Sequence, residues 1–183
     1  MTNRLRCAIT LAFVAAGGAS AAEETGDYGP WRLGMSKKEV VAIARYGPYR
    51  DVASTGGVET AKGFFDNGPA NVSFVFGEAG LAKIQIWVYE GRSIEEAIAG
   101  WFHVYDYFRR KYGKVESRIL QLSEPLEQTD FAARVRALLS TQSDAVVKLQ
   151  MAPDPMPDGV KVFSSLFRDP RVGFFVFVFY QQP

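Results

Sequence analysis

The chain has 183 residues, of which 48% are hydrophobic and 22% charged, and its net charge is +1. This balance excludes a disordered chain and is typical of a globular protein with one domain or two small ones. The small net charge gives no general attraction for nucleic acid, so we expect no nucleic-acid partner. Aromatic residues make up 14% of the chain, which favours β-structure with large apolar contacts.

The first 22 residues have the features of a secretory signal peptide in the expected order. Two arginines precede ten apolar residues over 7–16, and a run of small residues follows. We therefore expect cleavage near Ala21 or Ala22 and a mature α+β domain over 23–183, located in the periplasm or outside the cell. The alternative interpretation is a buried N-terminal helix.

Cleavage at this point would change both the charge and the chemistry of the protein. It would remove Arg4, Arg6 and Cys7, leaving 19 basic residues against 20 acidic ones and no thiol. A disulfide and cysteine catalysis are then excluded. No later run reaches the roughly 18 apolar residues that a membrane-spanning helix needs, so we expect no transmembrane segment.

The first half of the mature chain predicts one short helix and three strands. Ser36 and Glu39 form a capping box, and the helix that they open is expected to end near Tyr46, before Gly47-Pro48. Three strand candidates follow: Thr60–Asp66, Asn71–Phe76 and Leu81–Tyr89. In the third, Ile84, Ile86 and Val88 face one way, and Lys83, Gln85, Trp87 and Tyr89 face the other.

The second half repeats this order of elements. Ser93 and Glu96 form a second capping box before the longest helix, which Gly113 ends. Residues 114–122 are ambiguous between strand and loop, and Ser123-Glu124-Pro125 is expected to begin a third helix. The remaining strand candidates are Ala145–Met151, Val160–Phe167 and Val172–Tyr180.

The repeated order predicts an α+β fold with antiparallel sheet packed by helices. A shift of 91 residues places apolar positions on one another, for example Phe76 on Phe167 and Ile84 on Phe175. One interpretation is therefore two tandem helix-plus-three-strand units, over 30–114 and 123–183. The other is a single antiparallel sheet of six strands with helices on one face.

One stretch of the sequence resembles a module of exported bacterial proteins. Residues 33–40 (LGMSKKEV), Tyr46-Gly47-Pro48, a strand pair and a long helix that ends at Tyr112-Gly113 follow in order. This pattern is similar to SmpA/OmlA-type assembly lipoproteins and to the β-lactamase-inhibitor-protein type. The resemblance implies a cofactor-free binding or scaffold protein with a helix-plus-sheet module. The chain departs from both types, because it has no Cys after residue 7.

The sequence offers few groups for catalysis. His103 is the single histidine, with Asp106 three residues later, and there is no G-x-S-x-G motif. One His and one Cys cannot make a common zinc site, so we expect no cofactor and no enzymatic activity. An enzyme that uses carboxylates alone is the least favoured alternative.

The basic cluster at the end of the long helix comprises Arg109, Arg110, Lys111 and Lys114. Such a cluster could bind lipid phosphate or an acidic partner. The alternative interpretation is that these cations complement the helix dipole and are otherwise solvated.

The strand candidate Val172–Tyr180 (VGFFVFVFY) is apolar on both faces. Phe175, Phe177 and Phe179 share one face, and a strand of this kind must be covered on both sides. We therefore hypothesise a binding or interaction protein that uses these residues, with Trp87 and Tyr89, to contact a protein partner or a second copy. The alternative interpretation is that another layer of the same chain covers these residues. The alternative function is a carrier of a small apolar ligand held between helices and sheet.

Overall fold

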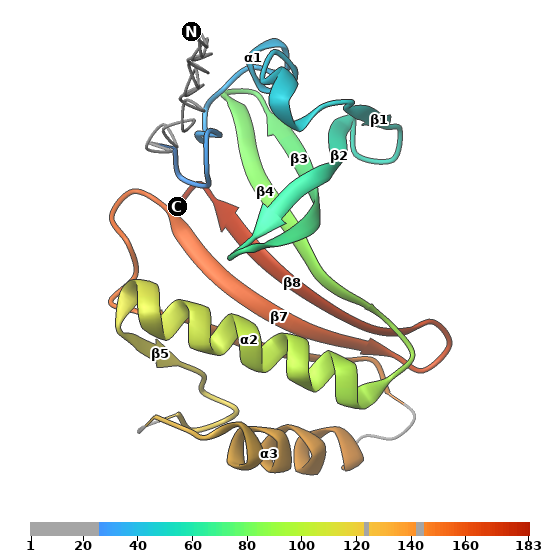
Figure 1. The fold of residues 1–183 in the computed structure, drawn as a ribbon, viewed down its shortest axis with the longest axis vertical. Helices are drawn as coiled ribbons and strands as arrows, with labels where there is room; N and C mark the ends of the chain where they lie inside the picture. Colours follow the sequence, from blue (N-terminus) through green and yellow to red (C-terminus); the bar gives the residue numbers. More distant parts are fainter. Residues whose placement is uncertain (1–25, 123–124, 142–144) are drawn as a thin grey trace, which may run out of the picture.

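The computed structural model describes residues 26–122, 125–141 and 145–183. The expected signal segment and cleavage site, and the Ser123-Glu124 helix entry, lie outside these residues. The elements, shown in Figure 1, are α1 (Lys37–Val41), the 3-10 helix η1 (Ala44–Tyr46), β1 (Arg50–Val52), β2 (Gly57–Phe65), β3 (Gly68–Gly77), β4 (Gly80–Gly91), α2 (Ile94–Tyr112), β5 (Lys114–Glu116), α3 (Gln128–Ser140), β6 (Val147–Asp154), β7 (Lys161–Asp169) and β8 (Gly173–Gln181).

Within the described residues, the strands form one antiparallel sheet of eight, in the order β1-β2-β3-β4-β8-β7-β6-β5. Figure 1 shows α2 lying across β7 and β8, with α3 beside it. The α+β class is therefore confirmed, with two more strands than the single-sheet interpretation supposed. The short strands β1 and β5 sit at the two edges and have too few residues to show an alternating pattern.

Local sequence signals account for the beginning of α1 and for both ends of α2. Ser36 and Glu39 form both bonds of a capping box at α1. At α2, the Ser93 hydroxyl accepts a hydrogen bond from the Glu96 amide, but the amide of Ser93 donates to the Tyr89 hydroxyl instead of to Glu96. Gly113 ends α2 at φ +91°, a conformation that glycine adopts without strain.

The core lies between α2 and the sheet. We call the sheet face that contacts α2 the inner face and the opposite one the outer face. Trp101 of α2 is fully buried, donates from Nε1 to Ser164 Oγ of β7 at 3.1 Å, and meets the ring of Phe131 from α3. The inner face continues into the N-terminal half, where Trp31 packs against Tyr46. The sequence predicted only an extended arm around Trp31, because a single buried ring leaves no periodic pattern.

The 91-residue shift does not align equivalent positions of the two halves. Ile84 pairs with Tyr180 and is fully buried on the inner face, whereas Phe175, its counterpart under the shift, lies on the outer face. A one-residue offset exchanges the two faces of a strand, so this register cannot relate two superimposable units. The sheet order nevertheless sets β2–β4 and β6–β8 symmetrically about the β4–β8 pair.

Phe131 connects α3 to α2, and its truncation should show in the stability. We expect Phe131→Ala to lower the free energy of unfolding by about 3–5 kcal/mol, because it opens a cavity beside Trp101. Phe131→Leu is the control and should cost less than about 1.5 kcal/mol. Urea unfolding followed by circular dichroism measures both, and equal losses for the two variants would contradict this packing.

Candidate functional site

The residues of β8 alternate between a buried face and a partly exposed one. Val176, Val178 and Tyr180 are fully buried on the inner face. Phe175 and Phe177, which point the other way, remain partly exposed, as does Phe179. No described helix or strand lies over the outer face, so the intramolecular cover that the aromatic strand requires is present on one side only.

The outer rings form a continuous cluster over three neighbouring strands. Trp87 of β4 lies edge-on to Phe177, with ring centroids 4.7 Å apart. On the other side of β8, Phe163 stacks on Phe179 at 4.7 Å and Phe167 lies 6.0 Å from Phe175. We call these side chains the outer aromatic cluster: Trp87, Phe163, Phe167, Phe175, Phe177 and Phe179.

Phe163 and Phe167 are members of the cluster that the sequence did not predict. Both lie on the expected strand Val160–Phe167, and their four-residue spacing places them on one face of it. Their contribution depends on the register of β7 against β8, which sets Phe163 opposite Phe179 and Phe167 opposite Phe175. That pairing is a tertiary property which strand periodicity does not contain.

Tyr89 does not belong to the outer aromatic cluster, so the prediction that it shares a face with Trp87 is wrong. The register shifts between the pairs Trp87–Phe177 and Tyr89–Val176, which leaves Val88 as an extra residue in β4. This bulge turns Tyr89 toward α2, where its hydroxyl lies 3.1 Å from the Glu96 carboxylate and from the Ser93 carbonyl. Burial and the bond to Glu96 raise the pKa of Tyr89.

Hollows lie on both sides of the cluster, one toward β3 and the other toward β6. Beside Trp87, a hollow of about 440 Å³ is lined by polar and charged side chains that include Asn71, Glu59 and Glu90. Beside Phe163, another of about 400 Å³ is lined by Met156 and by other residues of the β5–β7 region. The apolar cluster is thus bordered by mixed, more polar surface.

The four basic residues at the end of α2 do not form one patch of unpaired charge. Arg110 bonds Asp66 at 2.8 Å and Asp106 at 3.0 Å, and these hydrogen bonds raise its pKa. Lys114 bonds Asp154 at 2.7 Å and Glu116 at 3.2 Å.

The other two basic residues lie against tyrosine rings. The Arg109 guanidinium lies 5.6 Å from the ring of Tyr105, and Lys111 donates to the Tyr107 hydroxyl at 3.1 Å. The basic side chains that the sequence predicted as a patch therefore interact with acidic and tyrosine side chains of the same chain.

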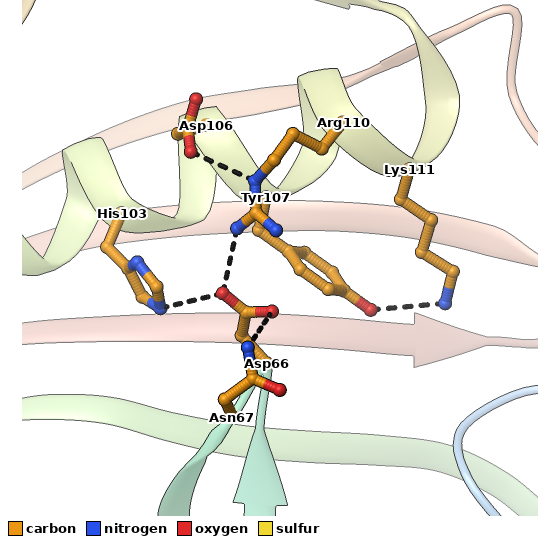
Figure 2. Close-up of polar contacts among 7 residues, drawn as sticks. All are labelled: Asp66, Asn67, His103, Asp106, Tyr107, Arg110 and Lys111. Carbon is orange, nitrogen blue, oxygen red and sulfur yellow. Dashed lines mark hydrogen bonds and ion pairs between the residues drawn. The ribbon is translucent and has the colours of Figure 1, made fainter.

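His103 takes part in a contact between the sheet and α2 (Figure 2). Asp66 lies on the turn between β2 and β3. The Nε2 of His103 lies 3.5 Å from the Asp66 carboxylate, and Arg110 forms an ion pair with the same carboxylate. The expected acidic neighbour, Asp106, bonds Arg110 instead. These contacts hold the β2–β3 turn against α2, so the structure assigns His103 a place in packing the sheet around the helix.

Two absences apply to the residues that the structure describes. Among them, no group of three or more His, Cys, Asp or Glu side chains is arranged to hold a metal ion. None of the described helices is both long enough and apolar enough to cross a bilayer.

The accessibility of the cluster can be measured through its tryptophan. The chain has three tryptophans, and Trp31 and Trp101 are fully buried, whereas Trp87 is partly exposed. We expect acrylamide to quench mainly the emission of Trp87 in dilute solution. Trp87→Phe should remove the quenchable fraction and Trp101→Phe should retain it; the reverse result would place Trp87 in the interior.

Comparison with known proteins adds no relative to this picture. No protein-family model, curated protein or solved structure matches the chain. The similarity to the SmpA/OmlA and inhibitor types therefore stays a prediction from sequence, and the function has to be argued from the geometry of the chain itself.

Proposed function

We propose that this protein is an exported, non-enzymatic interaction protein that binds a macromolecular partner through the outer aromatic cluster. The observation that carries the proposal is the set of six aromatic side chains on a face that no described element covers. Contiguous apolar patches with polar borders are typical of interaction sites, and aromatic residues contribute most strongly to binding energy there.

The arrangement of the rings favours a macromolecule over a small ligand. Phe175 and Phe177 are nearly parallel, with an interplanar angle of 6°, and Phe163 and Phe179 stack at 23°. The rings therefore support one another along and across the strands and present a broad, ridged surface instead of an enclosing pocket. Such a surface gains most of its binding energy by excluding water over a wide contact.

The alternative, a carrier of a small apolar ligand between helices and sheet, has less support. The side chains of α2 that point to the sheet are fully buried there, among them Trp101, Val104 and Phe108. Ring contacts between Trp101, Phe131 and Tyr105 fill the space between α2 and α3. A ligand in this layer would have to displace packed side chains, and close-packed interiors resist such displacement.

Export is supported by the order of basic, apolar and small residues in the first 22 positions. The intact mass of the protein recovered from its native cells tests this part of the proposal. We expect a mass that corresponds to a chain beginning at residue 22 or 23, in a fraction outside the cytoplasm. A chain that retains these residues in the cytoplasmic fraction would overturn export.

Binding through the cluster can be tested by site-specific photo-crosslinking. A photoreactive phenylalanine analogue at Phe177 should give adducts with a macromolecule in intact cells, because this side chain lies in the middle of the outer aromatic cluster. The same analogue at Ala133, an exposed position of α3, is the control. The adducts should disappear when Trp87→Ala is added.

Equal yields at positions 177 and 133 would overturn binding through this face. A bound small mass in native mass spectrometry, without macromolecular adducts, would favour the carrier function instead.

A further inference from the structure

Charged side chains border the outer aromatic cluster at both ends of β4. Lys83 and Lys161 both pair in register with Gln181, so they occupy one cross-strand row at one end of the cluster. At the other end of β4, Glu90 pairs with Phe175. With a rise of about 3.3 Å per residue, Lys83 and Glu90 lie about 20 Å apart along the strand. β4 thus carries Lys83 at one end of this face and Glu90 at the other, with the exposed Arg92 two residues beyond Glu90.

These charges differ from those at the end of α2, because neither Lys83 nor Glu90 forms an ion pair within the described parts of the chain. Lys83 Nζ lies 5.7 Å from the ring centroid of Phe179, at the border of the cluster. Glu90 is exposed and lines the hollow beside Trp87. Both groups are available for a partner that contacts the rings between them.

We propose that this partner is a second copy of the chain, packed outer face to outer face with its strands antiparallel; the inference rests on the proposed function. A two-fold axis that lies between the two sheets, at right angles to the strands, sets each strand opposite the same strand of the second copy. The two strands of each such pair then run in opposite directions. Lys83 then faces the partner's Glu90, and Glu90 faces the partner's Lys83. Such a contact is self-complementary, as a two-fold dimer requires, and aligned strands are an ordinary packing of two sheets.

The charges also select this arrangement over the other two-fold arrangement of the same faces. An axis parallel to the strands would bring the same strand ends of the two copies together and would set β4 opposite β7 of the partner. Lys83 would then approach the partner's Lys161. Like charges that face each other across an interface are unfavourable, whereas the first arrangement pairs opposite charges twice. The cluster itself would be buried in both cases, so the charges at its ends decide the orientation.

The size of the patch sets the expected affinity. Its three strands are about 4.8 Å apart and its rows about 6.6 Å apart, so the cluster with its charged ends covers about 14 Å by 20 Å. This is about a third of the roughly 800 Å² that each partner buries in a standard interface. We therefore expect a dimer that dissociates at micromolar concentration or above.

A charge exchange tests the dimer and its orientation together. Sedimentation velocity over a concentration series measures the dimer dissociation constant of the wild type, K83E, E90K and the double variant K83E/E90K. We expect each single reversal to raise the dissociation constant about tenfold or more, because it places like charges opposite each other twice. The double variant should return to within about threefold of the wild type, since it restores opposite charges in both pairs.

Each other outcome overturns the inference in a defined way. A dimer that tolerates both single reversals uses another surface, and a double variant that stays dissociated contradicts the antiparallel arrangement. A wild type that stays monomeric at high concentration excludes the second copy as the partner. In that last case, adducts of Phe177 with a different macromolecule would leave the proposed function standing. Circular dichroism of all four proteins checks that the fold is kept.

Discussion

The architecture depends on one constraint: β8 is apolar on both faces, while the described helices pack against one. Burial of Val176, Val178 and Tyr180 beneath α2 removes the inner face from water and provides the main driving force for folding. A two-layer domain completes its core in this way with a single layer of helices. The outer rings are not part of that core, and the proposed interaction with a partner rests on their partial exposure.

A small irregularity in β4 decides which aromatic residues belong to each face. Trp87 and Tyr89 would share a face in a regular strand, yet the extra residue Val88 separates them. Trp87 joins the outer cluster, and Tyr89 instead bonds Ser93 and Glu96 at the beginning of α2. The same bulge therefore shapes the candidate binding face and anchors the helix that covers the other side of the sheet.

The charged side chains of the described residues differ in whether they hold elements of the fold together. Arg110 and His103 of α2 contact Asp66 of the β2–β3 turn (Figure 2). These contacts hold the turn against the helix. Lys83 and Glu90 have no such partners within the described residues and flank the rings on the outer face. Surface charges of this kind contribute little to affinity but strongly to the orientation of a complex.

The sequence by itself determined the class of fold, the main strands and helices, and the two-sided apolar character of β8, because these depend on periodicity and on capping residues that act over a few positions. It did not determine that Phe163 and Phe167 join the cluster, that Tyr89 leaves it, or that Asp66 engages His103 and Arg110. Those features depend on strand register, on a bulge and on a contact between residues about 40 positions apart. Only the tertiary structure fixes them, since each results from how distant segments pack and not from the local order of residues.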